Sequence, residues 1–469
     1  MRALLVWMIV ATILMLPCAV CPALAETARS RDFDPAFEAL ILVNVAAPSR
    51  VLTEVRLRPG VLSVHSGPDS LGTRTQVEEL ASHGLSGRSL RLAAIRVQPS
   101  VLDSLVLRWT AIDLRVEEAW IQPITEGSPT VIRLDRRVEA GEVLVLNLLW
   151  HPDAQSDAVT DWRPSMVLEE FVEPPIGARI YVSEEVTGIV AVHERTGGRL
   201  VRALPTGGQP RDLVWDDRRQ RLYVSVAGRD ELQSIDPSGR ETIVRLPLSF
   251  GADPTRLLLS RDGQRIAVLG PGRDQLYLFS AASLQELAKI PVGQDPVSLA
   301  EDPRSGRIFV SCRTAGRIDV VDPESARVVA RFEQLDSPSE LVVLRSGILA
   351  VGQQRGRSIN LLDPATGALL GAVELCGSAD GLVEVERLDR LFVLSNFCSE
   401  ITITRPLAGL ETGAIRLEER AGLPTLGPRG AEIYLPLPDS RRVALIAVDR
   451  GVERRYLDVG PTPWRVVAP

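Results

Sequence analysis

The sequence is poor in the side chains that carry most Schiff-base, haem and metal chemistry. Among 469 residues there is one lysine, Lys289, and there are four histidines. A Schiff-base mechanism needs a desolvated lysine in a pocket, so this class of reaction is nearly excluded. No histidine follows a Cys-x-x-Cys pair and no two have a zinc-like spacing, so we expect no covalent haem and no metal site, and we predict no cofactor. The histidines are His65, His83, His151 and His193.

Motifs of nucleophilic and nucleotide chemistry are also missing from the sequence. There is no G-x-S-x-G elbow, no P-loop and no H-E-x-x-H pair. The net charge is −7, and no basic cluster accompanies it. Binding to nucleic acid or to an anionic membrane surface depends on cationic patches, so we expect neither partner.

The first 25 residues have the pattern of an export signal. Arg2 supplies a positive start, an apolar run follows from Leu4 to Leu16, and Ala23-Leu24-Ala25 is a small-residue cleavage site. Pro17 and Pro22 interrupt the apolar run, which makes an uncleaved membrane anchor the weaker alternative. No other stretch is long enough to span a membrane, so we expect a mature protein that is periplasmic or secreted.

A short motif repeats along the last three fifths of the chain. The first copy is Arg179-Ile-Tyr-Val-Ser183, and Arg221-Leu-Tyr-Val-Ser225 and Arg307-Ile-Phe-Val-Ser311 resemble it closely. A period in the low forties built from short β-rich runs is typical of a β-propeller with four strands per blade. The first apolar residue of each copy lies at position 180, 222, 266, 308, 348, 391 or 433.

Turns recur at fixed places within these repeats. Asp322-Pro-Glu-Ser325 and Asp363-Pro-Ala-Thr-Gly367 suit hairpin turns, and Gly251-Ala-Asp-Pro254 and Gly293-Gln-Asp-Pro296 lead into the next blade. With these turns, residues 179–469 resemble the YVTN-type β-propeller repeat family of surface-layer and periplasmic proteins. The resemblance implies the fold and little about function, because propellers serve as binding proteins, lactonases and dehydrogenases.

The count of strands predicts how the ring closes. Seven copies begin with the outer part of a blade at Arg179, and the chain ends in Pro463-Trp-Arg-Val-Val-Ala468, which matches an inner strand. We therefore expect seven blades, with the C-terminal strand completing the blade that begins at Arg179.

The segment before the repeats has a different pattern. Residues 26–150 contain about seven to nine short strands separated by Gly, Pro, Ser and Asp, which suggests an immunoglobulin-like β-sandwich. Residues 76–83 are expected to form a short helical turn. Prolines limit regular structure in residues 151–178, which we interpret as a linker. The expected strands are 37–45, 50–57, 89–97, 105–109, 112–121, 130–134 and 142–150.

Export leaves three cysteines, and an oxidising compartment permits one pair. Cys376 precedes an inner strand and Cys398 follows its antiparallel neighbour, so the two should lie side by side. We predict a disulfide between them. Cys312, at the same end of another blade, is the rival partner.

One constellation of side chains is a candidate binding site. The second residue after each blade-start proline, or after the equivalent Asp380, should face one mouth of the central channel. The positions include Asp212, Arg256, Ser298, Glu340 and Arg465, a mixed-charge set. The structural interpretation is that opposite charges pair and line a water-filled channel. The functional interpretation is a polar ligand site in which Arg256 and Arg465 clamp a carboxylate.

These observations favour a non-catalytic role. We predict a cell-envelope scaffold or binding protein whose partner is a protein or a small polar ligand. The alternative is an enzyme, either a lactonase-like hydrolase or a redox subunit resembling the propeller chain of amine dehydrogenases. The mouth offers two carboxylates and no histidine, which weakens the hydrolase alternative.

Overall fold

The computed structural model describes residues 33–48, 50–123, 129–153, 162–169, 173–237, 243–450 and 452–469. The predicted export signal, residues 1–25, lies outside these ranges. The chain is all-β, as predicted, and strands rich in Val, Ile, Leu and aromatic residues make up most of it. In the described ranges no helix is long and apolar enough to cross a membrane.

The N-terminal region forms two sheets that share one core. A four-stranded sheet has the order β10-β9-β1-β5, and a six-stranded sheet contains β3-β2-β6-β7 with β4 and β8 attached. Ile41 and Leu92 of the first sheet pack with Leu62 and Leu105 of the second. The elements are β1 (Ala39–Ala46), β2 (Val55–Ser66), β3 (Asp69–Arg74), β4 (Leu80–Ala81), α2 (Ser82–Leu85), β5 (Ser89–Val97), β6 (Ser100–Val116), β7 (Ala119–Ile121), β8 (Thr130–Val138), β9 (Val143–Trp150) and β10 (Met166–Leu168).

Three predicted element boundaries in this region were wrong. The strand expected from residue 50 begins at Val55. The carboxylate of Asp153 accepts the N–H groups of Leu52 and Thr53, so these groups are not available for pairing with a neighbouring strand. Residues 105–109 and 112–121 were expected as two strands, but β6 is continuous through 105–109 and up to Val116, and a turn at 117–118 separates it from β7. The helical turn is α2 at 82–85, later than expected.

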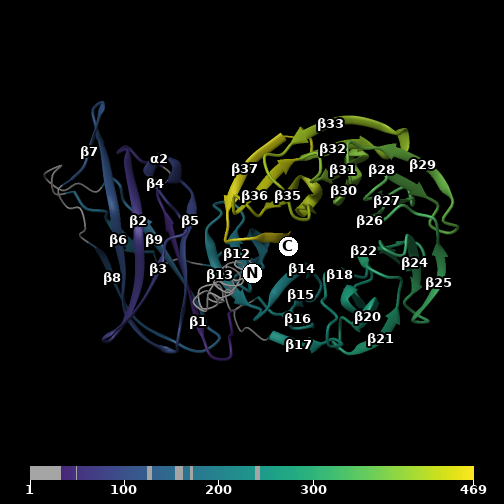
Figure 1. The fold of residues 1–469 in the computed structure, drawn as a ribbon, viewed down its shortest axis with the longest axis horizontal. Helices are drawn as coiled ribbons and strands as arrows, with labels where there is room; N and C mark the ends of the chain where they lie inside the picture. The colour runs from purple at the N-terminus through teal and green to yellow at the C-terminus, as the bar shows by residue number, and fades with distance from the viewer. Residues whose placement is uncertain are drawn as a thin grey trace, which may run out of the picture. The chain divides into compact units, whose positions relative to one another are not determined.

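Residues 179–469, here called the repeat region, form seven four-stranded antiparallel sheets in the described part of the chain. Figure 1 shows them following one another around a common centre. The strands are β11 (Arg179–Glu184), β12 (Ile189–Glu194), β13 (Leu200–Pro205); β14 (Gln209–Asp216), β15 (Arg221–Ala227), β16 (Glu231–Ile235), β17 (Ile243–Pro247); β18 (Arg256–Leu259), β19 (Arg265–Gly270), β20 (Gln275–Ser280), β21 (Glu286–Pro291); β22 (Pro296–Glu301), β23 (Ile308–Cys312), β24 (Arg317–Asp322), β25 (Arg327–Phe332); β26 (Pro338–Val343), β27 (Leu349–Gln353), β28 (Ser358–Leu362), β29 (Leu369–Glu374); β30 (Gly381–Val385), β31 (Arg390–Ser395), β32 (Glu400–Arg405), β33 (Leu410–Arg416); β34 (Thr425–Leu426), β35 (Glu432–Leu437), β36 (Arg442–Ala447), β37 (Val452–Asp458) and β38 (Pro463–Val467).

Short 3-10 turns accompany these strands. They are η2 (Ile176–Ala178), η3 (Pro271–Arg273), η4 (Glu386–Leu388), η5 (Pro406–Ala408) and η6 (Pro428–Gly430).

The repeated motif is the second strand from the centre in each sheet. All six residues of β11 are buried, because neighbouring sheets cover both faces of the strand. Adjacent sheets share cores: Tyr223 of β15 packs in one cluster with Ile266 of β19 and Tyr277 of β20. Burial on both sides explains why the motif is a continuous apolar run.

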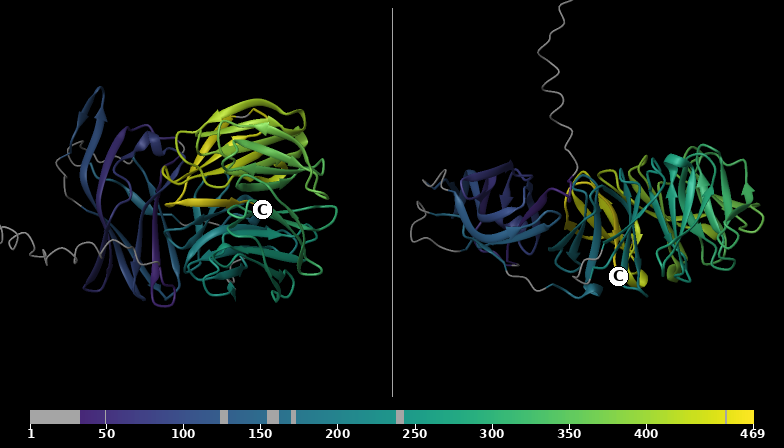
Figure 2. Two further views of the ribbon diagram at one scale, coloured as in Figure 1. Left: turned by 45° about the vertical axis from the view of Figure 1, so that its right-hand side comes forward. Right: turned by 90° about the horizontal axis from the view of Figure 1, so that it is seen from below.

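The C-terminal strand joins the first sheet of the repeat region. β38 pairs antiparallel with β11, and Val466 lies opposite Val182. The yellow β38 is accordingly seen beside the teal strands in Figures 1 and 2. The predicted pairing of the C-terminal strand with the strand that begins at Arg179 is therefore present.

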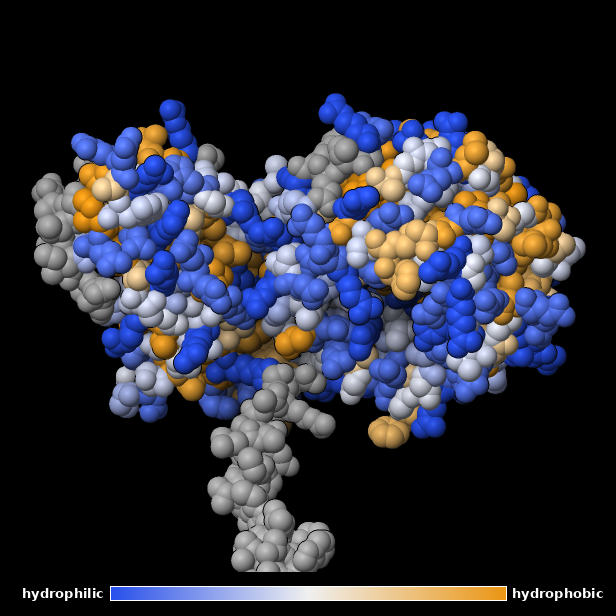
Figure 3. Space-filling model, turned by 45° about the horizontal axis from the view of Figure 1, so that its top comes forward, coloured by the Kyte–Doolittle hydropathy of each residue, from blue (hydrophilic) through white to orange (hydrophobic). Residues whose placement is uncertain are grey.

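The outer strands of the repeat region leave apolar side chains exposed. Leu287 of β21, Val329 of β25 and Leu369 of β29 are about half exposed or more. The face drawn in Figure 3 is mostly hydrophilic, and hydrophobic groups gather at its right-hand edge, the side on which β25 and β29 lie in Figure 1. The outer strands therefore offer mainly apolar side chains, and a polar ligand site is expected at the innermost strands of the repeat region.

Candidate functional site

The innermost strands line a cavity of about 360 Å³, here called the inner cavity. All seven positions that the repeat alignment singled out contribute to its wall, because each occupies the same place on an innermost strand. They are Asp212, Arg256, Ser298, Glu340, Leu382, Leu426 and Arg465. The repeat alignment thus located a set of residues that the structure brings together.

Asp212 and Arg465 form one ion pair of this set. Nε of Arg465 lies 3.0 Å from Oδ1 of Asp212, and the aspartate is almost completely buried. Its other oxygen accepts the backbone N–H of Leu257 at 2.9 Å. Asp212 therefore ties the inner strand β14 both to β38 on one side and to β18 on the other.

Arg256 and Glu340 form a second ion pair, between β18 and β26. Nη2 of Arg256 lies 2.5 Å from Oε1 of Glu340. Ser298 on the intervening strand β22 donates its hydroxyl to the same carboxylate at 3.1 Å. Its oxygen also accepts the N–H of Leu341 at 3.2 Å, so Ser298 links two neighbouring inner strands as Asp212 does.

The neighbouring carboxylates keep the buried Arg256 charged. Burial by itself lowers the pKa of Arg256, but the carboxylates of Glu340 and Asp212 outweigh burial, and the net shift of the pKa is upward. Both arginines already have a carboxylate partner in place. A carboxylate ligand clamped by Arg256 and Arg465 would have to compete with Glu340 and Asp212.

A second cavity of about 390 Å³, here called the mouth cavity, shares Arg256 and Glu340 with the inner cavity. Its other walls come from loops before the inner strands and from turns after the second strands. Arg313 and Asn396, which follow the second strands β23 and β31, both line it. Glu185, after β11, pairs with Arg211 of the wall, whereas Glu184 is buried and paired with Arg91 of the N-terminal region.

One wall of the mouth cavity was not predicted from the sequence. Arg420, Ala421, Gly422 and Leu423 form it together with Trp464. This loop follows β33, in the repeat that departs most from the others, so its residues had no counterpart in the alignment. An aromatic side chain beside a blade-start proline was the only available signal.

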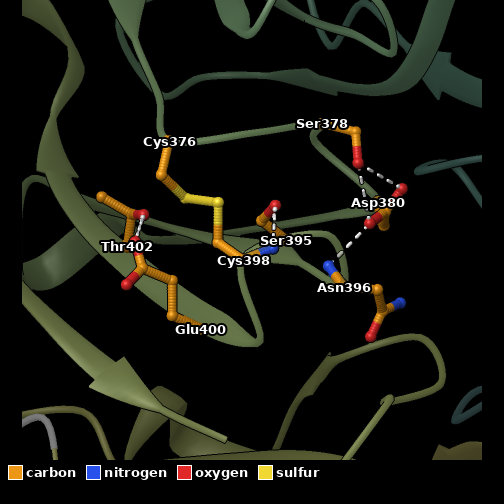
Figure 4. Close-up of a disulfide and its surroundings, with 8 residues drawn as sticks. All are labelled: Cys376, Ser378, Asp380, Ser395, Asn396, Cys398, Glu400 and Thr402. Atoms are coloured by element: carbon orange, nitrogen blue, oxygen red, sulfur yellow. Dashed lines mark hydrogen bonds between the residues drawn. A yellow bond between two sulfur atoms is a disulfide. The ribbon is translucent and has the colours of Figure 1, made fainter.

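The predicted disulfide lies beside this wall. Cys376 and Cys398 are bonded, with their Cα atoms 6.3 Å apart. Figure 4 shows Asp380 next to it, where the carboxylate accepts the hydroxyl of Ser378 at 3.1 Å and the N–H of Asn396 at 2.7 Å. The disulfide thus joins the two loops that present Asp380 and Asn396 to the mouth cavity.

The third cysteine is not part of this site. Cys312 is a buried free thiol, and burial raises its pKa to about 12, so it is protonated at neutral pH. In the part of the chain that the structure describes, no three His, Cys, Asp or Glu side chains are grouped to hold a metal ion.

Comparison with known proteins adds to the description of the fold. No family model matches the chain. No curated protein matches it. A functionally unknown protein from Desulfotomaculum acetoxidans superposes with a TM-score of 0.51 at 14% identity, covering 61% of this chain and 99% of its own. The dihydro-heme d1 dehydrogenase NirN, in complex with DHE, superposes with a TM-score of 0.50 at 13% identity, covering 63% and 76%.

The repeat region is a β-propeller. A streptogramin B lyase also superposes, with a TM-score of 0.48 at 15% identity, covering 61% of this chain and 90% of its own. At these identities the likeness extends to the fold alone. What the propeller binds has to be argued from its own cavities.

Proposed function

We propose that the chain is an exported cell-envelope binding protein of the YVTN-like type. Its parts are a signal peptide (residues 1–25), an immunoglobulin-like sandwich (26–150), a linker (151–178) and a seven-bladed propeller (179–469). The mouth cavity of the propeller holds a small polar ligand or an extended segment of a protein partner. Arg256 and Glu340 of this cavity, with Asp212, Ser298 and Arg465 of the adjoining inner cavity, form the polar base of the site.

One observation carries this proposal. Polar side chains from several different sheets, among them Asp295, Arg313, Asp380 and Asn396, converge on one cavity that also contains an aromatic ring, Trp464. A concave site of a few hundred Å³ with a few convergent polar groups is the usual form of a small-ligand site. Binding energy is available there from both polar contacts and an apolar surface.

A cavity-filling variant tests the proposal. Val297 lines the mouth cavity and is half-buried, so Val297→Phe should fill the site with little effect on the sheets. Protein purified from the envelope fraction, with Glu26 as its N-terminal residue, is screened by thermal shift against polar acids, sugars and short peptides. We expect at least one class to raise the melting temperature of the wild type and not that of Val297→Phe.

The matched control is Val329→Phe on the outer strand β25, where the side chain is 46% exposed. This variant should respond to ligand as the wild type does. A ligand that stabilises Val297→Phe and wild type equally would place the site elsewhere. A chromophore in the purified protein, or turnover of a lactone, would favour the enzyme alternative instead.

A further inference from the structure

The charges around the mouth cavity do not balance. Its lining includes four arginines and three carboxylates. All three carboxylates are already engaged by neighbouring donors. Asp295 receives Nε of Arg313 at 2.8 Å and the hydroxyl of Thr314 at 3.0 Å, Glu340 receives Arg256 and Ser298, and Asp380 receives Ser378 and Asn396. No carboxylate of this wall is left to bind a cation.

Three of the arginines are likewise engaged. Arg211 pairs with Glu185, Arg256 with Glu340, and Arg313 with Asp295. The fourth, Arg420, is exposed and has no ion pair or side-chain hydrogen bond within the described ranges. The mouth cavity therefore presents one guanidinium group whose donors are free for a ligand.

Hydrogen bonds hold the backbone at Ala421 and Leu423, directly after Arg420. The side-chain amide of Asn396 donates to the carbonyl of Ala421 at 3.0 Å and accepts its N–H at 2.7 Å. The N–H of Leu423 donates to the carbonyl of Trp464 at 3.2 Å. The backbone next to Arg420 and the backbone of Trp464 are thus held together at the edge of one cavity.

Gly422 brings this loop and Trp464 into close contact. A Cβ atom at position 422 would lie 2.6 Å from the carbonyl oxygen of Trp464, closer than atoms can approach without displacement. The N–H of Gly422 is also used, since it donates to the carbonyl of Pro436 at 2.9 Å. The spacing of Arg420 and Trp464 therefore depends on a residue without a side chain.

We propose that the mouth cavity binds a carboxylate attached to an apolar or aromatic group. Arg420 donates to the carboxylate, and the indole of Trp464 packs against the apolar part. One free guanidinium matches the single charge of a carboxylate, and guanidinium-carboxylate pairs form paired, charge-assisted hydrogen bonds. The inference rests on the proposed function of the cavity and specifies the ligand class. The carboxylate belongs either to a free organic acid or to the C-terminal residue of a peptide.

Two pairs of probes test the inference by isothermal titration. N-acetyl-L-phenylalanine and its amide represent a free acid, and Gly-Gly-Gly-Phe with a free or an amidated C-terminus represents a peptide. We expect each acid to bind at least about tenfold more tightly than its amide, as loss of a charge-assisted hydrogen bond requires. The tighter of the two acids identifies the source of the carboxylate.

The variant Arg420→Gln should weaken binding of the acid about tenfold and leave the amide unchanged. Arg405→Gln is the control, because Arg405 is also exposed but ends β32 far along the strand from the mouth. Equal affinity for acid and amide, no binding of either acid, or unchanged affinity in Arg420→Gln would overturn the inference. Loss of binding in Val297→Phe with no effect of Arg420→Gln would retain the cavity as the site and reject only the carboxylate assignment.

Discussion

At the scale of single residues, the buried polar groups mainly hold neighbouring elements together. Asp212 and Ser298 each accept a backbone N–H from the next inner strand. Arg91 and Glu184 form an ion pair in which both side chains are almost fully buried, between the N-terminal region and the first sheet of the propeller. A buried charge is tolerated only with such a partner. Polar residues near the centre are therefore not automatically ligand contacts.

His193 on β12 is buried, and only one of its two ring nitrogens has a hydrogen-bond partner among the described residues. Its Nδ1–H donates to the carbonyl of Gly198 at 2.9 Å, and its Nε2 has no partner among the described residues. The pKa of His193 is lowered from 6.5 to about 4, first by burial and then by the cation of Arg91, which together outweigh the hydrogen bond to Gly198 and the carboxylates of Glu184 and Asp458. The neutral ring is therefore the form that the folded protein accommodates.

We expect this histidine to make unfolding pH-dependent. A pKa lower in the folded than in the unfolded state gives stability that is complete above pH 6.5 and is lost as the pH falls toward about 4. The loss should approach roughly 1.4 kcal/mol per pH unit within that window. Denaturant titrations at pH 7, 6, 5 and 4 measure it, and His193→Gln should show a shallower slope. Parallel slopes for the two proteins would assign the acid sensitivity to carboxylates.

At the scale of elements, the loops at the mouth differ from one repeat to the next, whereas the strands are similar. The inner strands follow the repeat, whereas the walls of the mouth cavity come from turns whose lengths differ between sheets. One of these walls is secured by the disulfide between Cys376 and Cys398 and by the Asn396–Ala421 hydrogen bonds. The chain of contacts runs from the disulfide to the loop that carries Arg420.

Removing the disulfide should affect both stability and this wall. On the chain-entropy model a bridge spanning 22 residues contributes about 3 kcal/mol. We expect Cys376→Ser/Cys398→Ser to lose about that amount in denaturant unfolding, and residues 419–424 to exchange their amide hydrogens faster. Reductant should reproduce both effects in the wild type and have none on the double variant. Unchanged exchange at 419–424 would show that the loop is held by its hydrogen bonds alone.

The sequence allowed the regular elements, the pairing of β38 with β11 and the disulfide to be predicted, but not the ion pairs between side chains. The repeated motif located the buried second strands, and equivalence of repeats was enough to place Asp212, Arg256 and Glu340 around one cavity. The identity of ion-pair partners depends on how far each side chain reaches across the ring, which repeat position does not encode. Arg420 and Trp464 escaped prediction because one lies in an irregular loop and the other was recognised only as part of a strand.

At the scale of the whole molecule, the two ends of the repeat region depend on each other. β11 is separated from β38 by nearly the entire propeller in sequence and pairs with it directly. The same first sheet also receives the N-terminal region, since Leu40 and Leu42 of β1 share a core with Ile180 and Val182. The first sheet is therefore the place where the fold is completed and where both regions meet.

Deletion of the C-terminal strand tests this dependence. Without residues 464–469, β11 loses its partner on one edge, Val466 and Val467 no longer cover the core, and Asp212 loses Arg465. An unpaired central strand edge promotes association with other chains. Loss of two buried valines and the strand hydrogen bonds should lower the melting temperature by at least about 10 °C. Light scattering and thermal melting measure the two effects. Deletion of residue 469 alone, which lies beyond β38, should leave both unchanged. A truncated protein that melts like the intact one and stays monomeric would mean that the first sheet is stable with three strands and that closure contributes little.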